Sequence, residues 1–244
     1  MAASVRAVLF DLYGTLLAFG DMMAAWRAWG GLIYERMLRA GGQIDMETWP
    51  GLLEEVFAAT GPEPNIEGLT VHEGRLMGLA TRVGARIDDD GVRAMATDGL
   101  ALWQREMNLA PGAREVLIAL RQRGYATGLV TNFDHPPHVQ NLIEEHGLAP
   151  LLDVVVISGA VGLKKPDPAI MALALEALQV PAAEAVFVGD SPEDVQAAQG
   201  AGMAALGIVH DGDGSRLEEV TPDALVTSLD EVVVWLEERA AGEV

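Results

Sequence analysis

Four short segments contain side chains that could carry out chemistry together. They are Asp11–Thr15 (DLYGT), Thr131–Asn132 (TN), Lys165–Pro168 (KPDP) and Gly189–Asp194 (GDSPED). An aspartate can attack an electrophile as a nucleophile, and further carboxylate oxygens can hold a hard cation such as Mg²⁺. A lysine can balance the negative charge of nucleophile and substrate. A threonine hydroxyl and backbone amides can hold phosphate oxygens.

Each segment lies at or just after the expected end of a β-strand. The apolar runs predict strands at Val5–Phe10, Tyr125–Thr131, Val154–Ile157, Ala185–Val188, Ala204–Ile208 and Ala224–Val226. Helical patterns follow at Ala113–Arg123, His138–His146, Ala169–Leu178, Glu193–Gly200 and Leu229–Arg239. This alternation indicates a parallel sheet with right-handed crossovers. The carboxyl ends of such strands meet at one edge of the sheet, so we expect the four segments to line one crevice.

Residues 19–108 have a different pattern, with apolar residues at helical spacing. Helices are predicted at Met22–Ala40, Thr48–Thr60, His72–Val83 and Asp89–Glu106. We interpret this stretch as an all-helical insertion. The predicted organisation is a core domain of residues 1–18 and 109–244, with a helical domain of residues 19–108.

The composition excludes several classes of protein. Half of the 244 residues are hydrophobic, which is too many for a disordered chain. The formal net charge of -20 disfavours nucleic acids and anionic membranes as partners, since both are repelled. Without cysteine there is no disulfide, zinc–thiolate site or cysteine nucleophile. No apolar run approaches the roughly 20 residues needed to cross a bilayer, so we expect a cytoplasmic protein that acts on a small anionic molecule.

The four segments and their flanks resemble the motifs of the haloacid dehalogenase (HAD) superfamily of hydrolases. The matching stretches are FDLYGTL, LVTN, KKPDP and VGDSPEDVQAAQGAGM, in the family's order and spacing. The resemblance implies an α/β fold: a three-layer, Rossmann-like core around a parallel sheet. The helical insertion resembles the family's C1-type cap, which would close over the crevice, exclude water and set the choice of substrate.

The resemblance also implies how the reaction would run. Asp11 would be the nucleophile that forms a covalent aspartyl intermediate. Lys165 would steady the charge of nucleophile and substrate. Thr131 and Asn132, with Lys165, would bind the transferring group.

A metal site is implied by the same resemblance. Asp190 would bind Mg²⁺ together with Asp11 and the backbone carbonyl of Tyr13. Asp194 would anchor either the waters of the metal or Lys165. Thr15 and Ser191 would support this arrangement.

One position departs from the phosphatases of the family. These usually carry a second aspartate two residues after the nucleophile, as general acid and base, and here that residue is Tyr13. Family dehalogenases carry tyrosine there and need no Mg²⁺, but their fourth motif has Ser-Asn where this chain has Gly189-Asp190. General acid–base help is worth about 10²–10⁴-fold in rate. Buried carboxylates without a cation raise each other's pKa, which favours a bound divalent ion.

Three functions therefore stay open. The first is a Mg²⁺-dependent phosphatase of a small phosphorylated metabolite. The second is a 2-haloacid dehalogenase, which would also need a cap arginine, for which Arg36 and Arg39 are candidates. The third is a binding protein of this fold with little turnover.

Three further residues near the second motif have plain interpretations. Asp134 could replace the missing acid, although a loop or helix-cap role is favoured. His135 and His138 are interpreted as loop residues rather than metal ligands, because no other His or Cys is placed to complete a site.

Overall fold

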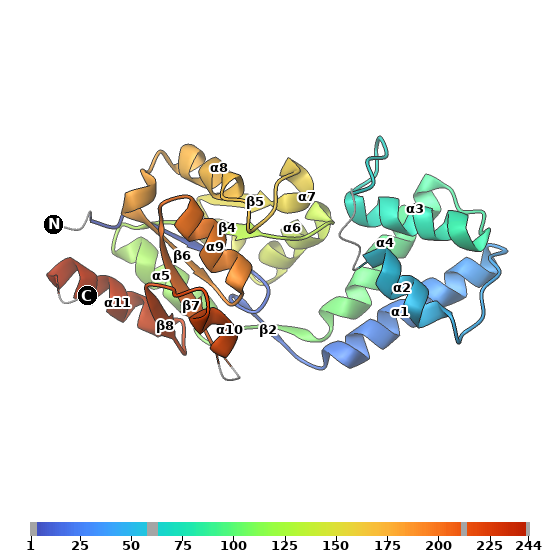
Figure 1. Ribbon diagram of the computed structural model, residues 1–244, viewed down its shortest axis with the longest axis horizontal. Helices are drawn as coiled ribbons and strands as arrows, with labels where there is room; N and C mark the ends of the chain where they lie inside the picture. The colour runs from blue at the N-terminus through green and yellow to red at the C-terminus, as the bar shows by residue number, and fades with distance from the viewer. Residues whose placement is uncertain (1–3, 58–62, 211–213, 243–244) are drawn as a thin grey trace. The chain divides into compact units, whose positions relative to one another are not determined.

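The computed structural model describes residues 4–57, 63–210 and 214–242. Contacts within the chain divide it into two compact units (Figure 1). Residues 1–18 and 109–244 form the first, which we call the core unit, and residues 19–108 form the second, the helical unit. Among the described residues, the longest apolar helical stretches fall short of what a membrane-spanning helix requires.

A six-stranded parallel sheet is the centre of the core unit. Its order is β5 (Val154–Ile157), β4 (Ala126–Thr131), β1 (Ala7–Phe10), β6 (Ala185–Gly189), β7 (Ala204–Ile208) and β8 (Ala224–Val226). The predicted parallel sheet is confirmed, with strand ends that differ from the prediction by at most two residues. The strands that follow β1 in the sheet are β4 and β5 on one side and β6, β7 and β8 on the other. The ends of β1, β4 and β6 therefore lie side by side, at the point where the strand order reverses and where such sheets bind ligands.

Alternate strand residues face two separate layers of helices. Val8 and Phe10 of β1 pack with α5 (Ala113–Gln122), α6 (Pro136–Glu145) and α11 (Asp230–Ala241). Ala7 and Leu9 pack with α8 (Ala169–Leu178) and α9 (Pro192–Gly200) on the other face. Short helices, α7 (Ser158–Val161) and α10 (Ser215–Glu218), complete the unit. The sheet with helices on both faces confirms the predicted three-layer core (Figure 1).

The start of α6 corrects one sequence-based interpretation. Pro136 occupies the first turn of the helix, with His135 as N-cap, where a missing backbone N–H costs nothing. His138 is therefore not a loop residue: it lies on α6, is buried, and its ring stacks on Phe133 with centroids 5.5 Å apart.

The described part of the helical unit contains four helices, which pack around an apolar core of their own; Figure 1 shows these helices. They are α1 (Met22–Arg39), α2 (Trp49–Phe57), α3 (Val71–Val83) and α4 (Asp89–Gln104). The last residues of the predicted helix Thr48–Thr60 lie outside the described part of the chain. A capping box of Thr70 and Glu73 begins α3, and Asp88 caps α4 by accepting a hydrogen bond from the Gly91 amide.

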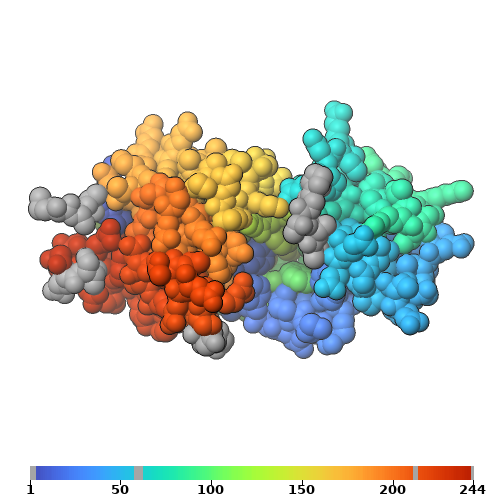
Figure 2. Space-filling view, viewed as in Figure 1, coloured from blue at the N-terminus to red at the C-terminus, as the bar shows by residue number. Residues whose placement is uncertain are grey.

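Where the chain passes from one unit to the other, it forms two short strands that the sequence patterns do not predict. They are β2 (Leu17–Phe19) and β3 (Met107–Leu109), which pair as a two-stranded sheet. In the space-filling view, the chain that follows β5, coloured yellow to red, forms most of the visible face of the core unit (Figure 2).

Candidate active site

The four sequence segments meet at one cavity of about 540 Å³ in the core unit. It is lined by Asp11, Tyr13, Thr131, Asn132, Lys164, Lys165, Pro166, Asp190, Ser191 and Glu193. The pairing of the strands explains this convergence. Asp11 follows β1 and its amide donates to the carbonyl of Val188 in β6, whose end leads directly to Asp190. The expected crevice at the strand ends is present.

Lys165 lies at the floor of this cavity as a buried cation. Its Nζ is 2.6 Å from Asp11 Oδ1, 2.6 Å from Asp194 Oδ1 and 3.1 Å from the carbonyl oxygen of Val130. Phe187 covers the ammonium group, with its ring centroid 5.3 Å from Nζ. The contacts to Asp11 Oδ1 and to the Val130 carbonyl are hydrogen bonds, and the contact to Asp194 Oδ1 is an ion pair.

Asn132 holds the backbone of Lys165 in place across 33 residues of sequence. Its Nδ2 donates to the Lys165 carbonyl at 2.9 Å, and its Oδ1 accepts from the Lys165 amide at 2.9 Å. The side-chain amide is therefore committed to this loop. Asn132, which the resemblance assigns to the transferring group, lines the cavity, and its side chain braces Lys165.

Asp194 holds Lys165 from the other side. It is buried in the first turn of α9, where its Oδ2 accepts from the Ser191 amide and hydroxyl at 3.0 and 2.8 Å. The same carboxylate thus caps the helix and pairs with Lys165 through Oδ1. Gly189 makes room for it, because a Cβ at this position would lie 2.4 Å from Asp194 Cγ.

A second glycine, in the first motif, leaves room for the side chain of Asp190. Gly14 has φ +83°, and a Cβ built there would lie 2.1 Å from Asp190 Oδ2. A larger residue would be both strained and blocked. Sequence patterns give no reason for glycine at this position, because the requirement comes from a contact with a residue 176 positions away.

Burial and mutual repulsion perturb the carboxylates strongly. Burial raises the pKa of Asp11 to about 6; Lys165 opposes this shift and Asp194 adds to it. Burial, with the charges of Asp11 and Asp194, raises the pKa of Asp190 to about 7. Burial lowers the pKa of Lys165, but the ion pairs with Asp11 and Asp194 outweigh it and raise it above its ordinary value.

These carboxylates fit a divalent cation. Asp11, Asp190 and Asp194 each offer an oxygen, and the three oxygens lie within 4.8 Å of one another. Lys165 alone leaves the cluster with excess negative charge, as the raised pKa values show. Because Asp194 is already held by Ser191 and Lys165, the oxygens of Asp11 and Asp190 are the better ligands for a hard cation.

Two hydroxyls at the cavity remain available to a ligand. Thr131 Oγ1 and the Tyr13 hydroxyl are buried and have no hydrogen-bond partner among the described residues. The Tyr13 ring stacks on Phe133 with centroids 5.0 Å apart. Burial and the neighbouring Asp11 carboxylate raise the pKa of Tyr13 above its usual range. The Tyr13 hydroxyl can therefore donate a hydrogen bond at neutral pH, but it gives up its proton reluctantly.

Several residues support this site without touching its centre. Thr15 is fully buried, and its carbonyl lies 3.1 Å from Nε2 of His210. Ser158 Oγ accepts from the Phe133 amide at 2.9 Å and so fixes the loop after β4. Neither His210 nor Ser158 was identified from the sequence, since no motif contains them. Asp134, the possible replacement acid, is not among the described residues that line the cavity.

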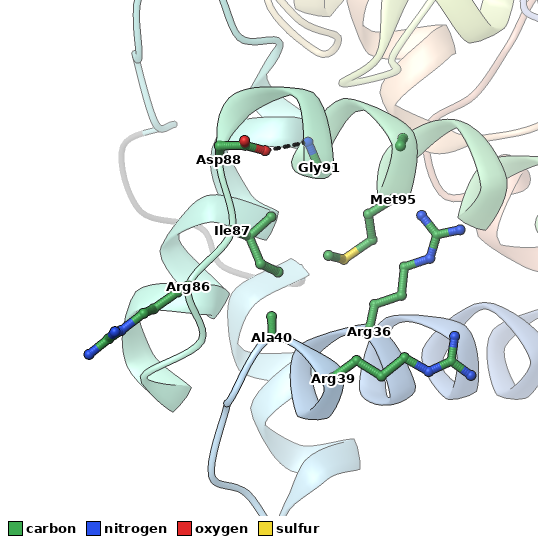
Figure 3. Close-up of a pocket in the computed structure, with 9 residues that line it drawn as sticks. Arg36, Arg39, Ala40, Arg86, Ile87, Asp88, Gly91 and Met95 are labelled. Carbon is green, nitrogen blue, oxygen red and sulfur yellow. Dashed lines mark hydrogen bonds between the residues drawn. The ribbon is translucent and has the colours of Figure 1, made fainter.

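The candidate cap arginines lie at a second cavity, of about 810 Å³, within the helical unit. Arg36 and Arg39 extend side by side from α1 toward one end of it, and Met95 points into it (Figure 3). Arg36 pairs with Asp98, and Arg39 pairs with Glu35 at 3.1 Å. Both guanidinium groups are thus bound to carboxylates of their own unit.

Known proteins resemble this chain over nearly its whole length. A phosphoglycolate phosphatase of Vibrio parahaemolyticus is 35% identical over 236 residues, which cover 94% of this chain and 95% of the relative. The crystal structure of a HAD phosphatase from Thermococcus onnurineus matches with a TM-score of 0.70 at 25% identity, over 95% of this chain and 98% of that one. A 2-haloacid dehalogenase from Pseudomonas syringae matches with a TM-score of 0.68 at 23% identity, over 96% and 99% of the two chains, which shows a shared fold alone.

The sequence also matches a family model directly. Residues 5–202, which include all four motifs, match the model described as haloacid dehalogenase-like hydrolase. The predicted family and the prediction of a hydrolase are thereby confirmed. The chain belongs to the haloacid dehalogenase-like hydrolase family.

Proposed function

We propose that this protein is a Mg²⁺-dependent phosphatase of a small, anionic phosphorylated metabolite, with Asp11 as its nucleophile. As a family member with phosphatase relatives, the chain is a phosphoric monoester hydrolase. The observation that carries the finer proposal is the Asp11 carboxylate, held by Lys165 at 2.6 Å beside the poorly compensated carboxylate of Asp190. The relatives make phosphoglycolate the first substrate to test.

Asp11, Asp190 and the backbone carbonyl of Tyr13 would hold the metal. When bound, Mg²⁺ supplies positive charge that neutralises the carboxylates and polarises a phosphate oxygen. The raised pKa values of Asp11 and Asp190 are consistent with a place for such a charge.

Asp11, Thr131 and Lys165 each have one part in the proposed reaction. An Asp11 oxygen attacks phosphorus, the P–O bond to the leaving group breaks, and an aspartyl-phosphate forms. Thr131 donates its free hydroxyl to a phosphate oxygen, while Lys165 keeps Asp11 oriented and ionised. Water then attacks phosphorus, which releases phosphate and restores the Asp11 carboxylate.

Tyr13 limits which leaving groups depart easily. With its pKa raised, the Tyr13 hydroxyl can stabilise negative charge on the leaving oxygen by a hydrogen bond, but it transfers a proton reluctantly. We therefore expect faster turnover of esters with acidic leaving groups. We also propose that the helical unit serves as the cap that selects the substrate.

The test measures phosphate release from p-nitrophenyl phosphate and 2-phosphoglycolate, with Mg²⁺ and with EDTA. We expect turnover only with Mg²⁺ and none in Asp11→Asn, with Asp11→Glu as a charge-matched control that misplaces the nucleophile. A single turnover in ¹⁸O-labelled water should place the label in the released phosphate. Turnover that EDTA does not affect would contradict the metal, and activity of Asp11→Asn would contradict the nucleophile.

Tyr13 favours one second candidate, a 2-haloacid dehalogenase. In that reaction an Asp11 oxygen displaces halide from carbon, and water then attacks the ester carbonyl, so the ¹⁸O label enters Asp11 itself. The pairing of Arg36 and Arg39 with their own carboxylates gives this candidate no free cap arginine at those positions. Metal-independent chloride release from 2-chloropropionate would establish it over the phosphatase.

A further inference from the structure

Among the described residues, the lining of the core cavity offers hydrogen-bond donors beside the nucleophile but no ready donor of a proton. Its carboxyl groups are those of Asp11, Asp190 and Glu193. In the proposed function Asp11 attacks phosphorus, and Asp11 and Asp190 hold the metal, so neither carries a proton at that moment. Glu193 is exposed, and an exposed carboxyl group is ionised at neutral pH. The carboxyl groups of the lining are therefore poorly suited to protonate a leaving group.

The remaining proton-bearing side chains of the lining hold their protons firmly. Lysine and tyrosine side chains lose a proton only near pH 10, whereas general acid catalysis works best when the pKa of the acid lies near the working pH. Lys165 is also held by ion pairs with Asp11 and Asp194. The Ser191 hydroxyl donates to Asp194 Oδ2 at 2.8 Å. These groups can orient or stabilise a substrate, but proton transfer from them to a leaving group is inefficient.

Tyr13 presents a buried hydroxyl at this cavity, and the hydroxyl has no hydrogen-bond partner among the described residues. The Tyr13 ring stacks on Phe133 with centroids 5.0 Å apart, and Phe133 stacks on His138 with centroids 5.5 Å apart. The Phe133 amide donates to Ser158 Oγ at 2.9 Å. Because both the ring and the backbone of Phe133 are held, Tyr13 is a fixed donor. A fixed donor that keeps its proton suits an oxygen that leaves as a stable anion.

Leaving groups of phosphate compounds differ greatly in their need for a proton. An alkyl ester releases an alkoxide, which is about as basic as the hydroxide formed from water, whose pKa is about 15.7. An acyl phosphate, the mixed anhydride of a carboxylic acid and phosphoric acid, releases a carboxylate. The pKa of a carboxylic acid is about 4, so the carboxylate leaves without a proton. It is also a strong acceptor for a hydroxyl donor such as that of Tyr13.

We propose that the substrates of this site are acyl phosphates, whose leaving carboxylate accepts a hydrogen bond from the Tyr13 hydroxyl. This inference rests on the proposed phosphatase function and names its substrate class. An Asp11 oxygen attacks phosphorus, the P–O bond to the acyl oxygen breaks, and the carboxylate departs with the bonding electron pair. Water then attacks the phosphorus of the aspartyl-phosphate. The oxygen and protons of that water leave in dihydrogen phosphate, and the Asp11 carboxylate is restored.

The first test compares acetyl phosphate with ethyl phosphate, which has the same number of carbon atoms, and with 2-phosphoglycolate, all with Mg²⁺. We expect kcat/KM for acetyl phosphate to exceed that for either alkyl ester by at least about 10²-fold, because the alkyl esters lack general acid help. In ¹⁸O-labelled water the label should enter phosphate and not acetate. Label in acetate would show attack of water on the acyl carbon and would overturn the proposal.

Substitutions at Tyr13 separate its hydroxyl from its ring. Tyr13→Phe keeps the ring, so kcat/KM for acetyl phosphate should fall about tenfold, as for a lost hydrogen bond to an anionic group. Tyr13→Asp supplies an acid and should raise turnover of ethyl phosphate by about 10²–10⁴-fold without raising that of acetyl phosphate. Tyr13→Asn, the control without an acid, should raise neither. Equal gains for both substrates in Tyr13→Asp, or full activity of Tyr13→Phe on acetyl phosphate, would refute the proposal.

Turnover of p-nitrophenyl phosphate distinguishes this proposal from the proposed phosphatase function, because it is an ester with an acidic leaving group but no acyl group. Its Mg²⁺-dependent hydrolysis without hydrolysis of acetyl phosphate would overturn the acyl phosphate proposal and leave the phosphatase function standing. Equal rates for acetyl phosphate and ethyl phosphate in the natural protein would do the same, since they would show that another part of the chain supplies an acid. Hydrolysis of none of these compounds would overturn both proposals.

Discussion

Removing the metal should make the stability of this protein depend on pH in an unusual direction. The folded state raises the pKa of Asp11 from 3.8 to about 6 and that of Asp190 from 3.8 to about 7. Between pH 3.8 and about 7 these two carboxyl groups therefore bind more protons in the folded chain than in the unfolded chain. Their contribution to stability must then fall as pH rises through this interval. Most carboxylates of proteins act in the opposite sense.

The magnitude follows from the sizes of these differences. The difference in pKa between the unfolded and folded states corresponds to about 3 kcal/mol for Asp11 and about 4 kcal/mol for Asp190, at 1.36 kcal/mol for each unit of pKa. The two carboxylates repel each other, so the contributions do not add fully. At pH 5 Asp190 still holds its proton in the folded state. About 2.6 kcal/mol of the stability difference between pH 5 and pH 8 should come from this residue alone.

The assay is urea unfolding of the chain in EDTA at pH 5 and pH 8, for the natural protein and for Asp190→Asn. The variant is a neutral isostere, so it should lose the part of the pH dependence that Asp190 contributes and be the more stable protein at pH 8. Mg²⁺ at 100 times its Kd should add about 2.7 kcal/mol to the natural protein at pH 8. Mg²⁺ should stabilise the natural protein much less at pH 5, where protons compete with it for the carboxylates. It should stabilise Asp190→Asn little. Equal stabilisation by Mg²⁺ at both pH values, or full retention of it in Asp190→Asn, would refute the reasoning.

Three further predictions concern single positions. Gly14→Ala places a Cβ against Asp190 in a left-handed backbone conformation, so urea unfolding should show a loss of about 1–2 kcal/mol or more. The variant should also be stabilised less by Mg²⁺, and stabilisation equal to that of the natural protein would contradict this. Tyr13→Asp adds a carboxylic acid beside Asp11, and its kcat for alkyl phosphates should rise by about 10²–10⁴-fold, with a smaller gain for p-nitrophenyl phosphate; equal gains would argue against missing acid catalysis. Burial, with the charge of His135, lowers the pKa of His138 from 6.5 to about 4. Stability should therefore fall as pH drops from 6.5 to about 4, by up to about 3 kcal/mol, and thermal unfolding of His138→Phe should show this loss removed.

Sequence patterns could predict several strand ends because polar residues of the candidate site interrupt runs of apolar, β-branched residues. The run before Asp11 and the run before Asp190 both end where a charged side chain leaves the buried sheet. Parallel pairing of β1 with β6 then brings these ends together. The cavity and its lining residues follow from that topology, which an alternating order of strands and helices predicts.

The contacts that orient the side chains could not be predicted in this way. Asn132 and Lys165 are linked by two hydrogen bonds over 33 residues, and no local spacing records such a pair. The need for glycine at position 14 depends on a carboxylate far away in the chain. The sequence pattern predicts this helix only from His138, whereas α6 begins at Pro136, because the first turn of a helix accepts proline.

The charge of the cluster decides how this site could bind an anion. A chain of net charge -20 repels phosphate esters at long range, and the ammonium group of Lys165 is already shared between Asp11, Asp194 and the Val130 carbonyl. In the proposed phosphatase, the further attraction that brings a phosphate dianion to Asp11 would come from a cation between Asp11 and Asp190 and from the hydroxyl of Thr131. The proposed function therefore couples substrate binding to metal binding by charge balance, since the cation has to offset both the carboxylates and the phosphate.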